Sequence, residues 1–144
     1  MQEKDCEFSY GGYEFADAEG KPIGKRVEVP LTINYKQALK NTIISTPSVM
    51  FDMTKLTKKD IEMPNLKRGQ DAATWWQVLK KIDKAYGINE VLFYYRRDAS
   101  SLSANKFKAL KRTWYLYRKI EKFNVVKSFY YFCFYVFNAI KKRT

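Results

Sequence analysis

The sequence predicts one domain with an α/β or α+β layout, in which strands and helices are mixed first and a pair of helices follows. Three observations favour it. The 144 residues are 46% hydrophobic and 17% aromatic, which is enough apolar surface for one core. Short segments rich in β-branched and aromatic residues alternate with turn residues, as in strands. From residue 106 onward, apolar residues recur every three or four positions, as in helices.

The N-terminal segment predicts a hairpin. Residues 6–15 alternate in polarity and form the first strand. Residues 17–20 (DAEG) form the turn, and residues 23–29 return as a second strand that Pro30 closes. Residues 35–40 then predict a short helix with Asn34 as its N-cap.

The middle of the chain predicts a strand, a helix and two further strands. Residues 43–52 are β-branched and apolar, so we expect a strand interrupted at Pro47. Residues 71–82 predict a helix whose apolar face contains Ala72, Trp75, Trp76 and Leu79. Residues 84–88 and 91–97 predict two short strands around a turn at residues 89–90.

The C-terminal segment predicts two helices. In the first, an apolar stripe is formed by Phe107, Leu110, Trp114 and Tyr117. The second covers residues 125–142 and begins after Asn124.

The net charge of +12 predicts an anionic partner, because the chain has 27 Lys and Arg residues but only 15 Asp and Glu residues. The excess lies from Lys106 onward, where Glu121 is the one acid; a solvated helix face is the alternative. Residues 123–140 approach bilayer-spanning length but include polar residues. They favour a helix on an anionic membrane surface, with a buried helix or a protein contact as alternatives. Nucleic acid is the least favoured partner, since packing explains the aromatic residues between the basic ones.

The cysteines indicate neither zinc nor a disulfide framework, because Cys6 and Cys133 lie far apart and the chain has no histidine. The acidic N-terminus does not resemble a signal peptide. We therefore expect a cytoplasmic setting.

Three groups of residues are candidates for chemistry. Asp71, at a helix start beside Gly69, could be a general base, and a simple capping role is the alternative. Trp75 and Trp76 are adjacent and so are not expected both to face the core. One of them could stack on a sugar ring, and packing of that Trp under a neighbouring loop is the alternative. The loop from Arg96 and Arg97 to Ser101 and Ser103 could bind a diphosphate, or be an ordinary solvated loop with Ser103 as an N-cap.

Taken together, these segments resemble the C-terminal portion of bacterial family 2 glycosyltransferases that build cell-surface polysaccharides. The similarity runs through the D-x-x-G turn and ISTPSVMFD to RGQDAATWWQVLKK, AYGINEVLFYYRR, SLSANKFK and WYLYRKIEKFNVVKSFYYF. It implies an α/β class, a partial GT-A fold with a mixed Rossmann-like sheet, flanking helices and a C-terminal helical pair. Residues 1–103 would belong to the GT-A domain and residues 104–144 would form a helical tail at the membrane.

The resemblance also implies site roles. The family inverts the anomeric centre, using a carboxylate of a Glu-Asp pair that begins a helix; here the pair is Gln70-Asp71. Asp71 would therefore be the base, and Gln70, Trp75 and Trp76 would contact the acceptor. The loop with Arg96, Arg97, Ser101 and Ser103 would lie near the phosphates of the nucleotide-sugar donor.

One departure from the family pattern is that the sequence has no Asp-x-Asp motif. About 100 residues that would bind the donor nucleotide and a Mg or Mn ion would precede this chain, which itself offers no metal motif. We expect a membrane-peripheral enzyme on the inner face of the plasma membrane, acting on a saccharide or lipid-linked acceptor, with this chain inactive alone. The alternative function is a non-catalytic module that binds a membrane or a partner through its basic aromatic C-terminus.

Overall fold

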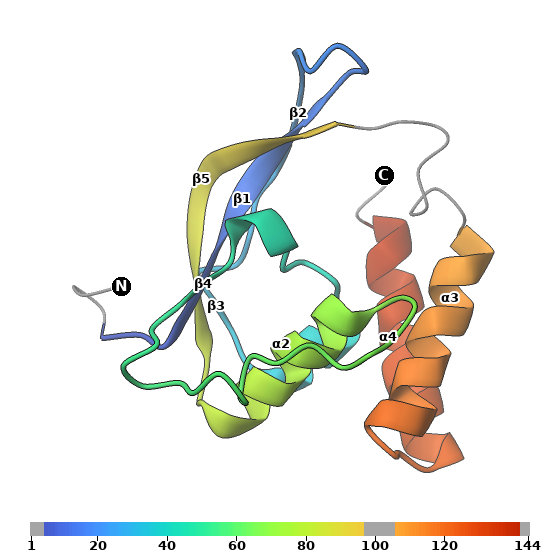
Figure 1. Ribbon diagram of the computed structural model, residues 1–144. Helices are drawn as coiled ribbons and strands as arrows, with labels where there is room; N and C mark the ends of the chain where they lie inside the picture. Colours follow the sequence, from blue (N-terminus) through green and yellow to red (C-terminus); the bar gives the residue numbers. More distant parts are fainter. Residues whose placement is uncertain (1–4, 97–105, 142–144) are drawn as a thin grey trace.

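The computed structural model describes residues 5–96 and 106–141. Within residues 5–96, five strands form one mixed sheet (Figure 1). The strands are β1 (Phe8–Ala16), β2 (Pro22–Val27), β3 (Thr32–Ile33), β4 (Met50–Phe51) and β5 (Ala85–Arg96). Their main order is β2-β1-β5-β3, with β4 paired to β1; β1 and β5 run parallel and the other pairs are antiparallel. Every residue of β1 is buried, so β1 is the centre of the sheet.

The predicted hairpin is confirmed. Strands β1 and β2 are joined by a turn in which the Gly20 amide donates to the Asp17 carbonyl at 3.1 Å. Gly20 has φ 85°, a left-handed conformation that glycine adopts without a Cβ clash. The turn therefore forms because of its own four residues, Asp17 to Gly20, as the sequence predicts.

The prediction of two strands in residues 84–97 is wrong, because β5 is one continuous strand. Gly11 is opposite Ile88 and Gly12 is opposite Val91, so Asn89 and Glu90 bulge out of the pairing instead of forming a turn. A Cβ added at Gly12 would lie 2.9 Å from the carbonyl oxygens of Glu90 and Val27. The bulge thus requires glycine on the neighbouring strand.

The strand predicted over residues 43–52 is also largely wrong. Residues Thr46–Ser48 form a 3₁₀ turn with Pro47 at its start, and only β4 remains as a strand. Proline has a fixed φ and no N–H to donate, so it favours this turn over a continuous ladder.

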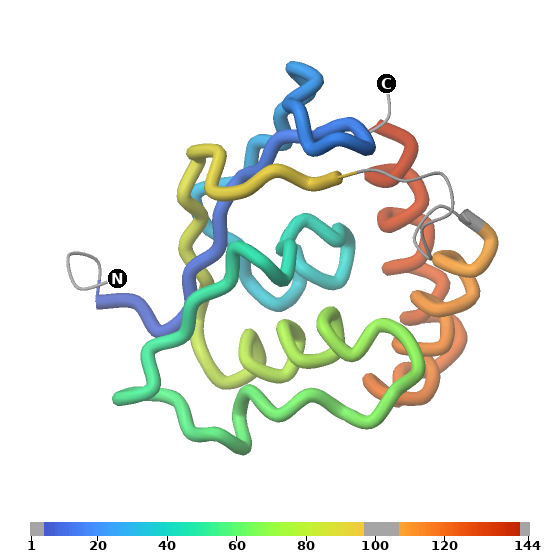
Figure 2. Tube along the Cα trace, turned by 45° about the horizontal axis from the view of Figure 1, so that its top comes forward, coloured from blue at the N-terminus to red at the C-terminus, as the bar shows by residue number. Residues whose placement is uncertain are grey.

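The helices form two further layers. They are α1 (Tyr35–Lys40), α2 (Gln70–Lys81), α3 (Lys106–Tyr115) and α4 (Val125–Lys141), with a π-helical turn, η3 (Leu116–Ile120), after α3. Figure 2 shows α1 and α2 between the sheet and the α3–α4 pair. The predicted mixed α/β class with flanking helices and a C-terminal helical pair is confirmed.

The starts of α1 and α4 agree with the predictions, whereas α2 begins after Gly69 and not with Asp71 as its N-cap. Asn34 accepts the Gln37 amide while the Gln37 side chain accepts the Asn34 amide, which is a complete capping box. At the start of α4, Asn124 accepts the Lys127 amide at 2.8 Å. Short-range sequence signals therefore determine both helix starts.

The apolar stripe predicted for the first C-terminal helix is partly wrong. Phe107 is 76% exposed, Leu110 and Trp114 are half-buried, and Tyr117 is fully buried. Leu116 is buried as well. Phe107 lies in the first turn of α3 and outside the buried cluster, whereas Tyr117 lies in η3 and belongs to that cluster. Helical spacing predicts which residues share a face but not how far along the helix that face is covered.

The core joins the C-terminal helices to the rest of the molecule. Leu116, Tyr117 and Tyr131 belong to the same buried cluster as Leu39 of α1 and Leu79 of α2. The division at residue 103 stays a prediction. Among residues 5–96 and 106–141, none of the helices combines the length and the apolar character that crossing a membrane needs.

Candidate acceptor site at the start of helix α2

Helix α2 begins after a glycine that supplies no side-chain cap. Gly69 is the N-cap, with φ 82° and ψ 13°, and it makes no side-chain cap hydrogen bond. Asp71 lies in the first turn, where its Oδ1 atom accepts the Ala72 amide at 2.8 Å. That contact satisfies one otherwise unpaired amide of the helix start. Asp71 is half-buried and forms no ion pair with a described residue.

Asp71 lines a small pocket of about 70 Å³ together with both tryptophans. The other lining residues are Ala38, Asn41, Thr42, Ile44, Ala72 and Arg112. Pockets that enclose a small molecule typically start near 300 Å³, so this recess has room only for one end of a substrate. The structure thus brings Asp71, Trp75 and Trp76 together, while Gln70 does not line the recess.

The expectation that Trp75 and Trp76 do not both face the core is wrong. Trp75 is 5% exposed and packs against both Phe8 and Phe51, with ring centroids 5.7 and 5.8 Å away. Trp76 is 3% exposed and stacks on Tyr117 at 5.5 Å. Helix α2 is covered on two sides, by the sheet and by α1 with η3, so adjacent positions can both be buried.

The two indole N–H groups differ in their hydrogen bonding. Trp76 donates from Nε1 to the Ala38 carbonyl at 3.2 Å. Trp75 Nε1 is buried and has no hydrogen-bond partner among the described residues. Trp76 is therefore tied to α1, whereas Trp75 is held by ring packing alone.

Arg112 is the pocket residue that the sequence did not single out. It comes from α3, and its side chain crosses the start of α2: a Cβ added at Gly69 would lie 3.0 Å from Arg112 Cδ. The guanidinium makes no hydrogen bond or ion pair with a described residue. In the sequence, Arg112 is one of many C-terminal basic residues, and no spacing links it to Asp71.

Of the residues predicted to contact the donor phosphates, the structure describes only Arg96. Arg96 is the exposed last residue of β5. Arg97, Ser101 and Ser103 lie outside the described residues, so their role near the donor phosphates stays a prediction. Within the described ranges, no three His, Cys, Asp or Glu residues cluster closely enough to hold a metal ion. The Mg or Mn ion expected for the complete enzyme also stays a prediction.

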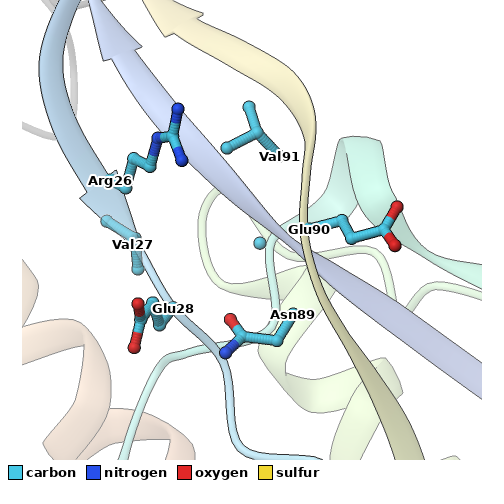
Figure 3. Close-up of a pocket in the computed structure, with 7 residues that line it drawn as sticks. Arg26, Val27, Glu28, Asn89, Glu90 and Val91 are labelled. Carbon is cyan, nitrogen blue, oxygen red and sulfur yellow. The ribbon is translucent and has the colours of Figure 1, made fainter.

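A second, larger hollow of about 300 Å³ lies at the bulge of β5 (Figure 3). Its walls come from three strands and the segment after β2. They are formed by Gly12, Arg26, Val27, Glu28, Asn89, Glu90 and Val91. The lining includes one arginine and two glutamates, and Arg26 already pairs with Glu14 at 3.4 Å. This mixture of charges favours no class of ligand.

Comparison with known proteins shows that the chain is similar to bacterial glycosyltransferases over nearly its whole length. TuaG of Bacillus subtilis, named for teichuronic acid biosynthesis, is 44% identical over 143 residues, which cover 99% of this chain and 56% of TuaG. WfgD of Escherichia coli is 32% identical over 143 residues, covering 99% of this chain and 54% of WfgD. WfaP of Escherichia coli is 39% identical over 99 residues, covering 69% of this chain and 35% of WfaP.

The predicted resemblance to part of a bacterial glycosyltransferase is therefore confirmed. The chain spans about half the length of TuaG and WfgD. WfgD and WfaP are both named as UDP-Glc:α-D-GlcNAc-diphosphoundecaprenol β-1,3-glucosyltransferases. No protein-family profile and no solved structure matches the chain. The alternative of a non-catalytic binding module finds no support among these relatives.

Proposed function

We propose that this chain, a relative of bacterial glycosyltransferases over nearly all of its length, forms the acceptor side of an inverting family 2-type enzyme. The enzyme would move a sugar from a nucleotide-sugar to a saccharide or lipid-linked acceptor. The observation that carries the proposal is the position of Asp71, whose half-buried carboxylate lines a recess large enough for the reacting end of an acceptor.

Asp71 would act as the general base. The Ala72 amide holds Oδ1, so Oδ2 is available to accept the proton of an acceptor hydroxyl. The hydroxyl oxygen then bonds to the anomeric carbon of the donor while the bond from that carbon to the diphosphate oxygen breaks. The nucleoside diphosphate leaves with the bonding electron pair. Because attack and departure occur on opposite faces, the anomeric centre inverts.

The remaining candidate residues would position the substrates. Gln70 would hydrogen-bond an acceptor hydroxyl, and Trp75 and Trp76 would form a rigid wall of the recess. Arg96, Arg97, Ser101 and Ser103 would contact the donor diphosphate. A Mg or Mn ion would neutralise charge on that diphosphate in the complete enzyme; the residues described here do not form its site, and no step above depends on it.

The acceptor would be a saccharide joined to a lipid through a diphosphate, as the names of WfgD and WfaP indicate for those proteins. The surface of helix α4 supports the proposal that the enzyme lies against the cytoplasmic face of the membrane. The outer face of α4 exposes Val126, Phe129, Tyr130, Phe134, Phe137 and Ile140. The charged residues of α4, Lys127 and Lys141, are both exposed and basic. The one acid after residue 106, Glu121, has a buried side chain paired with Lys80 at 2.8 Å and adds little negative charge to this surface.

The test is Asp71→Asn in this chain fused to the part of TuaG that it does not cover. Transfer from UDP-sugars to a lipid-linked saccharide is followed by release of UDP. We expect kcat to fall by about 100-fold or more, with unchanged donor affinity, because a general base typically contributes that much. Asp83→Asn, an exposed acid beyond the other end of α2, is the matched control. Turnover of Asp71→Asn above about a tenth of the parent rate would reject Asp71 as the base.

The same fusion tests whether the chain is inactive by itself. Since the chain spans about half the length of TuaG and WfgD, we expect UDP release only from the fusion. Release by the 144-residue chain at the rate of the fusion would contradict this part of the proposal.

A further inference from the structure

Arg112 is a half-buried cation without a partner among the described residues, although it lines the same recess as the Asp71 carboxylate. Its side-chain stem packs against Gly69, where an added Cβ would lie 3.0 and 3.2 Å from Arg112 Cδ and Cγ. Any other residue at position 69 would push the stem aside. The fold therefore fixes this arginine over the start of α2.

A half-buried guanidinium normally forms charge-assisted hydrogen bonds, because leaving such a charge partly desolvated and unpaired costs free energy. Among the residues that the structure describes, Asp71 is the only acid that lines the recess, and it forms no ion pair with Arg112. The half-buried Arg68 is the residue before Gly69 and adds a second cation nearby in the chain. The start of α2 adds the positive end of a helix dipole. The rim of the recess thus favours an anion supplied by a ligand.

We infer that Arg112 binds the diphosphate of the lipid-linked acceptor and thereby positions the acceptor sugar in front of Asp71. The inference rests on the proposed function, in which Asp71 receives the proton of the acceptor hydroxyl. One sugar ring separates that hydroxyl from the diphosphate on the same acceptor, so the diphosphate lies close to the base. The donor diphosphate leaves on the opposite face of the anomeric carbon and so lies away from the base. The planar guanidinium fork suits two phosphate oxygens.

The first test measures binding of inorganic pyrophosphate to the 144-residue chain in buffer without divalent metal, at physiological ionic strength. The Gly69 and Asp71 amides report the site by NMR. We expect Arg112→Gln, which keeps most of the stem, to raise the Kd about tenfold or more, the usual effect of losing a charge-assisted hydrogen bond. Lys111→Gln removes the same charge from an exposed neighbour and should change the Kd little. Equal effects of both variants would show non-specific attraction to a chain of charge +12 and overturn the inference.

Arg112→Lys keeps the charge without the fork, so it should bind pyrophosphate with a Kd between those of the parent and Arg112→Gln. Circular dichroism melting of all three variants separates loss of the site from loss of the fold. A normal melt with unchanged pyrophosphate affinity in Arg112→Gln would overturn the inference.

The second test uses the fusion enzyme and two acceptors, a sugar-diphospho-lipid and the same sugar as an alkyl glycoside. Arg112→Gln should raise the KM for the diphosphate acceptor about tenfold, leave the KM for the alkyl glycoside unchanged, and leave the donor KM unchanged. A higher donor KM instead would assign Arg112 to the donor diphosphate and reject the inference. Full activity of Asp71→Asn would reject the proposed base without affecting these Arg112 results.

Discussion

The two adjacent tryptophans of α2 should respond very differently to the same substitution. Trp75→Phe and Trp76→Phe each remove a similar part of a buried ring. Each should therefore lower the free energy of unfolding by about 1–2 kcal/mol through lost apolar burial. The difference arises at the indole nitrogen. Trp76 Nε1 donates to the Ala38 carbonyl, whereas Trp75 Nε1 is buried without a described partner.

The hydrogen bonding sets the size of that difference. Trp76→Phe leaves the Ala38 carbonyl with only the weak 3.4 Å bond from the Asn41 amide, at a cost of about 1 kcal/mol. Trp75→Phe removes an unsatisfied buried donor and regains about 1 kcal/mol. Trp76→Phe should therefore be the more destabilising by about 2 kcal/mol.

Urea unfolding followed by circular dichroism measures this difference. With a slope of about 2 kcal/mol per M, the midpoint of Trp76→Phe should lie about 1 M below that of Trp75→Phe. Phe107→Leu, at a 76% exposed position, is the control and should lie within about 0.5 kcal/mol of the parent. Equal midpoints, or a lower midpoint for Trp75→Phe, would refute the assignment of Trp76 as the hydrogen-bonded structural anchor.

Two further predictions concern pH and the membrane. Burial raises the pKa of Tyr10, Tyr35 and Tyr117 above the usual 10, so the folded chain holds these protons at pH values where the unfolded chain loses them. The contribution of these three tyrosines to stability should be constant below about pH 9, and stability should fall above about pH 10. Absorbance at 295 nm with circular dichroism tests this, and ionisation of all 11 tyrosines with the fold intact would contradict it. Replacing both Phe129 and Phe137 by Ser should weaken sedimentation with anionic vesicles about tenfold or more, since both rings are over 60% exposed on α4. Leu31→Ser, 65% exposed, is the control, and equal loss in both variants would exclude α4 as the contact surface.

The predictions that succeeded depend on neighbouring residues. Asn34 and Gln37 satisfy each other's backbone amides within one helical turn, so the start of α1 can be predicted without tertiary structure. The turn at Gly20 likewise depends on four consecutive residues. Such signals hold wherever the segment lies in the fold.

The predictions that failed depend on contacts between distant segments. Residues 89–90 have the composition of a turn, but pairing with β1 on one side makes them a bulge inside a continuous strand. Trp75 and Trp76 are both buried because α2 lies between two layers, and no helical spacing within α2 shows this. Arg112 joins the candidate site only because α3 packs over Gly69.

The parallel pairing of β1 with β5 has a consequence for biosynthesis. Ser9 is opposite Tyr86, so a ribosome has to make α1, α2 and everything between them before β1 can gain its parallel neighbour. The β1–β2 hairpin is complete much earlier and presents one edge of a strand whose residues are all buried in the final fold. Such an unpaired strand edge can pair with strands of other chains. Pairing of β1 with β5 is also slow, because the long chain segment between them has to close first. The nascent chain is therefore most exposed to aggregation, and most in need of a chaperone, in the interval between the synthesis of β2 and that of β5.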